Sequence, residues 1–203
     1  MLAAPFTNVL SGSLGSRMQW EKWHRCPCTG AEGSARHDCP LCNGEGGTFD
    51  PPSAIFRAGL TGVSAKQLEA LRTKLGPGLV GDASVSLPAN APAYGLVSSG
   101  DRFLAVDALD PIEWVLTPNT PVRLPSGAVV GQVFALGPQG ASLVAATLPA
   151  PGADGRIKVS QNLVVRMRAP RRFQVVADIG KLRSWITDLP QPFLLKQIDL
   201  TTR

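Results

Sequence analysis

Hydrophobic positions after residue 53 recur mainly with a period of two, which is typical of strands that bury one face. In the segment 79–87, for example, apolar side chains alternate with Asp82, Ser84 and Ser86. Turn-forming Pro, Gly, Asn and Ser residues separate this segment from later ones with the same pattern. Strands are therefore predicted at 79–87, 102–106, 112–116, 128–136, 142–148, 156–160, 163–168, 173–177 and 193–199.

A different period, of three to four residues, predicts one helix at 64–75. Ser64 can cap its first turn, and Gln67 lies three residues later, as in a capping box. The sequence Gly-Pro-Gly at 76–78 is a strong stop signal. Leucines at 68, 71 and 75 form a stripe that we expect to pack against the core rather than bind a partner.

Composition agrees with a mainly β fold. The chain has 203 residues, and its 21 Gly and 18 Pro make up about a fifth of them, well above the usual share of about 12 %. Because helix interiors tolerate neither residue well, a mostly helical protein is not expected. We predict an extended N-terminal arm at 1–16, a small zinc-ribbon or knuckle module at 17–52, and a β-sandwich or barrel-like domain at 53–203.

The hydrophobic segments are short. None approaches the roughly 18 uninterrupted apolar residues that a membrane-spanning helix needs. The first ten residues lack the basic region and sustained apolar run of a signal peptide. We therefore expect a soluble protein, with no membrane partner, that is kept in a reducing compartment.

All four cysteines fall in one short segment, as Cys26-x-Cys28 and Cys39-x-x-Cys42. Two close pairs separated by a loop are the pattern of a tetrahedral thiolate site, so we predict structural zinc. Two disulfides are the main alternative, but a bridge between Cys26 and Cys28 would close a very strained ring. An iron–sulfur cluster or a redox role is a further alternative.

Histidines near the cysteines offer a variant of the same site, in which His24 or His37 replaces one thiolate. Four thiolates already saturate zinc, so both histidines are predicted to be bystanders. Such a closed site has no open coordination position and cannot activate water, which makes its role structural. Trp20 and Trp23, just before the first pair, are expected to cover one side of the module.

Charge is concentrated in the last quarter of the chain, where ten Arg and Lys face four acids, although the whole chain carries only +5. A basic stretch can bind nucleic acid or an acidic partner, but basic residues also keep an exposed sheet face in water. We favour the second interpretation, because few aromatic residues are interleaved. The basic cluster comprises Arg156, Lys158, Arg166, Arg168, Arg171, Arg172, Lys181 and Arg183.

Catalytic patterns are missing from the sequence. No P-loop, G-x-S-x-G elbow or dinucleotide-binding glycine pattern occurs. Asp107, Asp110 and Glu113 are close enough to suggest a divalent-cation site, but they flank Pro111 and are better interpreted as turn and edge-strand acids. We therefore predict that the protein is not an enzyme and has no small-molecule substrate.

Two regions share a pattern with known proteins. Residues 20–49 contain Trp-x-x-Trp, then CPC, then DCPLCNGEG, and residues 163–200 contain P-x-x-x-x-V-V-x-D, then L-R, then L-P before L-L-x-x-x-D-L. Together they resemble a family of tailed-bacteriophage virion proteins. The tail positions that carry the resemblance are Pro170, Val175, Val176, Asp178, Leu182, Arg183, Leu189, Pro190, Leu194, Leu195, Asp199 and Leu200.

The resemblance implies a structural protein that acts as a homo-oligomeric ring in the virion, assembled in the cytoplasm of the host bacterium. It implies partners among the other neck and tail proteins (portal, adaptor, tail tube or terminator), with DNA in the channel as a further contact. A ring-forming adaptor at the head-to-tail neck is the favoured role, and a baseplate or tail component is the alternative.

Two other classes of function remain open at this point. A zinc-ribbon nucleic-acid-binding protein would use the cysteine module and the basic strands to grip phosphates. A scaffold or chaperone cofactor is suggested by the CxxCxGxG half-motif, which also occurs in chaperone zinc domains of the DnaJ type. Those domains repeat the motif four times, however, whereas this chain carries it once.

Overall fold

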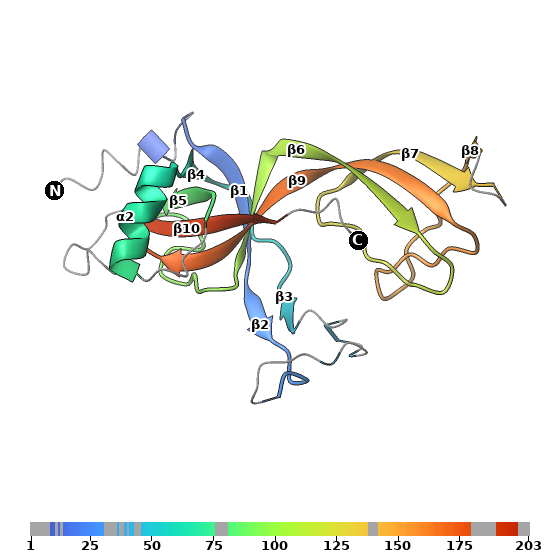
Figure 1. The fold of residues 1–203 in the computed structure, drawn as a ribbon, viewed down its shortest axis with the longest axis horizontal. Coiled ribbons are helices and arrows are strands. Elements are labelled where there is room, and N and C mark those ends of the chain that lie inside the picture. Colours follow the sequence, from blue (N-terminus) through green and yellow to red (C-terminus); the bar gives the residue numbers. More distant parts are fainter. Residues whose placement is uncertain are drawn as a thin grey trace. The chain divides into compact units, whose positions relative to one another are not determined.

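The structure is a computed structural model that describes residues 9–10, 12, 14–30, 36, 39, 41–42, 46–75, 81–137, 142–179 and 190–198. Within these residues the protein is mainly β, as the sequence predicts, and contains one short helix, α2 (Ala65–Leu75) (Figure 1). No helix of the described part has both the length and the apolar character needed to cross a membrane.

Six strands close into a barrel. They follow the order β10-β5-β4-β1-β6-β9, and β9 also pairs with β10, which closes the ring of strands (Figure 1). The pairings β1–β4, β1–β6, β4–β5, β5–β10 and β9–β10 are antiparallel. The strands are β1 (Ser16–Glu21), β4 (Phe56–Gly62), β5 (Ala83–Leu87), β6 (Arg102–Leu116), β9 (Leu163–Asp178) and β10 (Gln191–Ile198).

The chain divides into two compact units. The barrel unit consists of the described residues up to Asp107 together with Arg172–Ile198, and the sheet unit is Ala108–Arg171. Each of the strands β6 and β9 therefore has one part in the barrel unit and the other part in the sheet unit. This division differs from the predicted segments 17–52 and 53–203, because Ser16–Glu21 is a barrel strand rather than part of the cysteine module.

The barrel unit has its own apolar core. Buried side chains come from every barrel strand, and short apolar runs in β6 and β10 are buried on both faces. Such double burial explains why these runs do not alternate strictly. The largest fully buried apolar side chains of this unit are those of Met18, Val85, Leu87, Phe103, Leu104, Val175, Phe193, Leu194 and Leu195.

The sheet unit has a separate core on one face of its sheet. This sheet consists of β7 (Val129–Leu136), the short edge strand β8 (Leu143–Ala145), and the parts of β6 and β9 that lie within residues 108–171. Loops on either side of β7 and β8 supply further apolar residues to the same face. The buried cluster comprises Ile112, Trp114, Leu116, Ile157, Val159, Leu163, Val165, Met167 and Ala169.

Helix α2 begins as its sequence predicts. The backbone N–H of Gln67 donates to the Ser64 Oγ at 3.3 Å, and the backbone N–H of Ser64 donates to the Gln67 Oε1 at 2.9 Å, so the capping box is present. Leu68 and Leu71 of the predicted stripe are half-buried. The helix therefore covers part of the surface but contributes little to the core.

Two pairs of predicted strands are in fact single long strands. The segments 102–106 and 112–116 are joined in β6, and 163–168 and 173–177 are joined in β9. Pro111 and Pro170 suggested breaks, because proline removes a ladder N–H. Pairing along the rest of each strand outweighs that local loss.

The segment 156–160, in contrast, is not a strand. It makes one isolated antiparallel bridge, between Val122 and Ile157. The alternation that suggested a strand has another cause, since Ile157 and Val159 pack into the sheet-unit core while Lys158 is exposed. A smaller correction applies at 142–148, where the strand is limited to β8 (Leu143–Ala145).

Strands before residue 63 were not predicted. They are β1, β4 and the hairpin of β2 (Trp23–Arg25) and β3 (Gly47–Phe49). In β4 the alternation of Phe56, Ala58 and Leu60 was readable, but two glycines weaken its strand propensity. In the predicted arm 1–16, Val9 and Leu10 are helical where described, and the Leu10 side chain packs beside Gly59.

Several predicted features lie outside the described residues. They are the first eight positions of the arm 1–16, His37, the helix stop at 76–78, Leu79, and the tail positions Lys181, Leu182, Arg183, Leu189, Asp199 and Leu200.

Candidate metal centre

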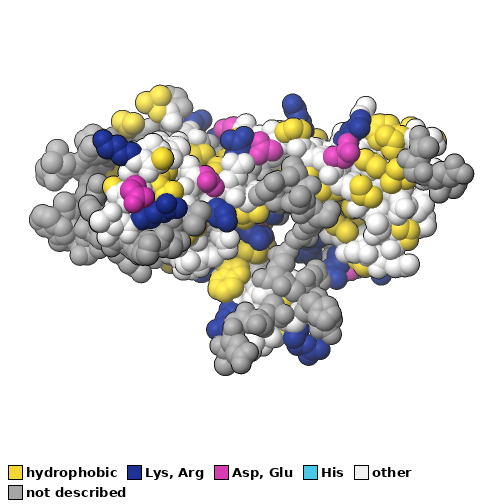
Figure 2. All heavy atoms as spheres, in the orientation of Figure 1, with side chains coloured by type: hydrophobic (Ala, Val, Ile, Leu, Met, Phe, Trp, Pro, Cys, Tyr) yellow, Lys and Arg dark blue, Asp and Glu magenta, His cyan; other side chains and the backbone are white. Residues whose placement is uncertain are grey.

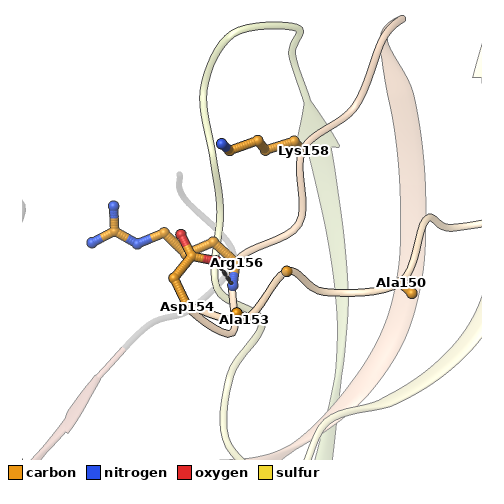
Figure 3. Close-up of a pocket in the computed structure, with 6 residues that line it drawn as sticks. Ala150, Ala153, Asp154, Arg156 and Lys158 are labelled. Atoms are coloured by element: carbon orange, nitrogen blue, oxygen red, sulfur yellow. Dashed lines mark hydrogen bonds between the residues drawn. The ribbon is translucent and has the colours of Figure 1, made fainter.

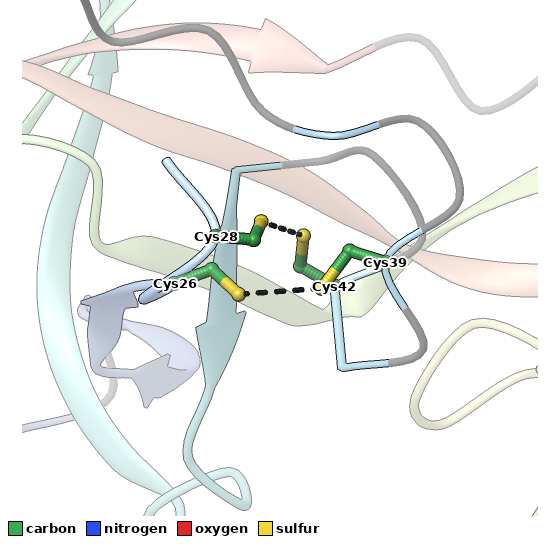
Figure 4. A group of neighbouring side chains, drawn as sticks. All are labelled: Cys26, Cys28, Cys39 and Cys42. Carbon is green, nitrogen blue, oxygen red and sulfur yellow. Dashed lines mark hydrogen bonds between the residues drawn. The ribbon is translucent and has the colours of Figure 1, made fainter. Parts of the chain in front are cut away.

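The four predicted metal ligands come together. The Sγ atoms of Cys26, Cys28, Cys39 and Cys42 all lie within 4.8 Å of one another (Figure 4). Two of the separations are 3.4 Å, from Cys28 to Cys42, and 3.7 Å, from Cys26 to Cys39. A tetrahedral thiolate site with metal–sulfur bonds of about 2.3 Å places its sulfurs about 3.8 Å apart. The cluster can therefore hold a metal ion.

The disulfide alternative does not fit this geometry. All four cysteines are free, and their sulfurs are farther apart than the bond length of about 2.05 Å that a disulfide requires. Each close approach also joins one cysteine of the first pair to one of the second, as two pairs that grip a common ion would do. The predicted ligand set is complete, with Cys26, Cys39 and Cys42 buried.

A short hairpin positions the first cysteine pair. Strands β2 and β3 pair antiparallel, with Arg25 opposite Gly47, and the Cys26 N–H then donates to the Gly46 carbonyl at 2.9 Å. The Cys26 carbonyl in turn accepts from the Thr29 N–H at 3.0 Å, which bends the chain around the sulfurs. These local bonds follow from the turn-forming sequence Cys-Pro-Cys-Thr.

Backbone hydrogen bonds and burial shift the pKa values of two of the cysteine thiols in opposite directions. Hydrogen bonds from the N–H groups of Cys42 and then Leu41 lower the pKa of Cys39 to about 6. Desolvation instead raises the pKa of Cys28 to about 12, against a hydrogen bond from the Arg36 backbone. Neighbouring thiols cannot all ionise without a compensating cation, which is the electrostatic condition that a bound divalent metal satisfies.

His24 is not part of the ligand set. Its Nε2 lies 2.8 Å from the Asp50 Oδ2, so the imidazole pairs with a carboxylate that follows β3. Both side chains are more than half exposed. This arrangement agrees with the predicted bystander role.

Trp23 attaches the cysteine hairpin to the barrel. Its indole lies against Gly47 of β3 on one side, where a Cβ would overlap the indole nitrogen and approach the His24 carbonyl to 2.8 Å. It also approaches Gly100, whose φ of +95° is a conformation that glycine adopts without strain. Trp23 thus covers part of the module, as predicted. The Trp20 indole N–H instead donates to Asp101 at 3.0 Å.

Asp101 is a positioning residue that the sequence analysis missed. Its side chain is 0 % exposed, yet its carboxylate accepts hydrogen bonds from the Trp20 indole, the Trp23 backbone N–H and the Ser98 backbone N–H, each at 3.0 Å. The Lys22 ammonium lies 3.3 Å away and neutralises its charge. Because three of these donors flank the turn between β1 and β2, Asp101 fixes the point where the cysteine hairpin leaves the barrel.

We expect Gly47→Ala to loosen the hairpin. The new methyl group would overlap the Trp23 indole and the neighbouring backbone, and overpacking of this kind costs about 1–3 kcal/mol. Gly62→Ala is the matched control, because a Cβ at Gly62 has no heavy atom within 4 Å. Trp fluorescence during chemical denaturation measures both, and equal stability of the two variants would contradict this account of Trp23.

The three acids of the sequence analysis do not form a cation site. They lie along β6, where Asp110 makes a double hydrogen bond with Arg171 at 2.7 and 3.0 Å and Glu113 binds Arg166 at 2.7 Å. Asp107 binds Arg17 of β1 at 3.2 Å. These acids were predicted to be turn and edge-strand acids, and that prediction is corrected, because residues 107–111 are themselves strand and β6 lies between β1 and β9 rather than at an edge. Their pairing also neutralises part of the basic cluster.

No protein-family model matches the chain, and no curated protein matches it.

Proposed function

We propose that the protein is a non-enzymatic structural subunit that assembles with copies of itself into a ring. One observation supports this above the others: within the described residues, the sheet unit has its buried cluster on one face of its sheet and ends in a free edge strand. Strand β8 is last in the strand order, and all three of its residues are exposed.

The face opposite the core carries apolar side chains beside charged ones. By the register of β7 with β9, Val129 and Phe134 lie on this face together with Arg166 and Arg168, whereas Val164 on the same face is buried. Val129 is 62 % exposed, and Val144 on the free edge is 61 % exposed. Figure 2 shows apolar side chains gathered at the upper right, over the end of the sheet unit where Figure 1 labels β7 and β8.

An open apolar edge strand favours association. Its unpaired backbone groups can extend a sheet in a neighbouring chain, and isolated proteins normally protect such edges with charges, prolines or bulges. The residues of β8 are Leu, Val and Ala, and none is charged. Ion pairs such as Arg166–Glu113 on the same unit keep the surrounding surface compatible with water until it is covered.

We infer that the metal is zinc. Four thiolates suit zinc or an iron–sulfur centre, and the closed set leaves no position for substrate, so the metal supplies folding free energy. Elemental analysis of the purified protein distinguishes the two, since iron with visible absorbance would overturn the zinc assignment.

The resemblance of residues 20–49 and 163–200 to virion proteins gives the ring its proposed place. We propose an adaptor at the head-to-tail neck of a tailed phage, with a baseplate component as the alternative. Neighbouring rings would then cover the open surfaces of each subunit. Electron microscopy of particles that carry a labelled copy distinguishes the two positions, and absence of the protein from purified virions would overturn both.

Replacing Val144 with Asp is expected to convert rings into single chains. The change places a charge on the free edge without touching either core, so the subunit remains folded while edge pairing is abolished. Light scattering coupled to gel filtration measures the mass of the particles.

Leu96→Asp is the control, because Leu96 is similarly exposed at 58 % but belongs to the barrel unit. A full-length protein that is monomeric under all assembly conditions, or a V144D variant that assembles normally, would contradict the proposed interface.

A further inference from the structure

Basic charge in the sheet unit falls into two groups with different surroundings. On the strands, Arg166 and Arg171 face the carboxylates of Glu113 and Asp110 at 2.7 Å. These two arginines therefore lie in ion pairs along the strands. The second group lies in the loops beside the strands and consists of Arg123, Arg156 and Lys158, of which Arg123 and Arg156 also have partners within the chain.

The bridge between Val122 and Ile157 brings this second group together. In an antiparallel bridge the next residues along, Arg123 and Arg156, lie opposite each other on the outer side when Ile157 points into the core. Lys158 alternates with the buried Ile157 and Val159 and is exposed. Figure 3 shows the side chains of Arg156 and Lys158 extending to the same side of the loop.

The loop that carries them is internally braced. The Gly152 N–H donates to the Arg156 carbonyl at 2.8 Å, and the Gly155 N–H donates to the Gly152 carbonyl at 2.9 Å. Asp154 closes the turn, because its Oδ1 accepts the Arg156 backbone N–H at 3.0 Å while its carbonyl accepts the Arg123 Nη2 at 2.7 Å. Three cationic side chains thus lie near a loop that contributes one carboxylate, that of Asp154.

Small residues leave room beside these cations. A surface pocket is lined by Ala150, Gly152, Ala153, Asp154, Arg156 and Lys158. Arg123 borders it, since its guanidinium comes within 3.4 Å of the position that a Cβ would take at Gly155. The pocket is therefore open to a ligand with negative charge and of small cross-section.

We propose that Arg123, Arg156 and Lys158 form a phosphate-binding site for the backbone of a nucleic acid. Among the described residues of the lining there is no aromatic side chain for base stacking, so binding would be independent of sequence. An acidic protein would need apolar anchors to bind stably, and the apolar side chains described in this lining are those of alanines. This site rests on charge placement within one chain and does not depend on the proposed ring.

Binding of a fluorescein-labelled duplex DNA of about 20 base pairs, followed by fluorescence anisotropy at several salt concentrations, tests the site. Lys158→Gln is the primary variant, and Arg123→Gln with Arg156→Gln completes the set. Removing one cation that pairs with a phosphate is expected to reduce the slope of log affinity against log salt by about 0.9. When all three cations are removed, the ratio of the affinity at 50 mM salt to the affinity at 200 mM salt should be roughly 40-fold smaller than for the unchanged protein.

Arg166→Gln is the matched control, because it removes the same charge from an arginine paired with Glu113. An equal reduction in this control, or no salt-dependent binding by the unchanged protein, would overturn the site. Stronger displacement of the labelled DNA by polyglutamate than by unlabelled duplex at equal charge concentration would overturn it as well, by favouring an acidic protein as the partner. The V144D variant distinguishes this site from the proposed assembly. Even as a single chain, it should bind DNA with a salt dependence that falls when Lys158 is replaced.

Discussion

Replacing Cys39 with Ser is expected to unfold the cysteine module while the barrel stays folded. The buried cluster of the module consists of Cys26, Cys39 and Cys42, with Cys28 packed against it, so a bound metal would take the place of an apolar core. Metal binding in modules of this kind supplies about 10–16 kcal/mol of apparent folding free energy. Cys39 is the most informative ligand, because backbone hydrogen bonds favour its thiolate and a serine hydroxyl does not ionise at neutral pH.

Limited proteolysis and metal content measure this result. The variant should lose its metal and be cut between β2 and β3, whereas the barrel should resist cleavage because its core is separate. A strong chelator should have the same effect on the unchanged protein. Leu41→Ser is the matched control, since Leu41 lies between two ligands but is 66 % exposed. A protected module without metal would show that the cluster is not the source of its stability.

Asp101→Ala should strongly destabilise the barrel. It would remove a fully buried carboxylate and leave the Trp20 indole and two backbone N–H groups without this acceptor, while the Lys22 ammonium would lose its ionic partner and keep the Leu96 carbonyl and the Ser98 hydroxyl. Breaking a buried charge pair costs about 3–5 kcal/mol. Urea unfolding followed by tryptophan fluorescence measures the destabilisation, and Trp20 and Trp23 report directly from the affected region.

The control for this change is Asp107→Ala. Asp107 also pairs with a basic residue, Arg17, but both side chains are about half exposed. Exposed pairs contribute about 0–1 kcal/mol, so the two aspartates should differ by several-fold. Similar destabilisation at both positions would indicate that the network around Asp101 is not cooperative. Asp101→Asn should lie between the two, because an amide keeps the shape and one acceptor but has no charge.

Local features were the ones that the sequence could predict. The metal ligands follow from the spacing of two cysteine pairs, and the start of α2 follows from Ser64 and Gln67, because each involves interactions over a few residues. The mainly β character follows from alternation and composition. All of these depend on residues that are close together in the chain.

Features that depend on distant partners were missed. Asp101 follows a Ser-Ser-Gly turn sequence, and nothing close to it in the chain indicates burial, since two of its donors come from positions near 20 in the sequence. Likewise, Asp110 and Glu113 were predicted to be turn and edge-strand acids, because their arginine partners lie more than 50 residues later. Pro111 and Pro170 concealed the two long strands, because only pairing with neighbouring strands shows that the backbone continues through them.

Strands β6 and β9 are neighbours in the sheet order, and each crosses from the barrel unit into the sheet unit. Topologically, residues 108–171 are therefore an enlarged hairpin connection of the barrel, which leaves through β6 and returns through β9. Such an arrangement allows an ancestral barrel to acquire a second body by lengthening one connection, without any change in the order of its strands. Descendants of that barrel can then vary the inserted body in size and surface while the closed barrel is inherited unchanged.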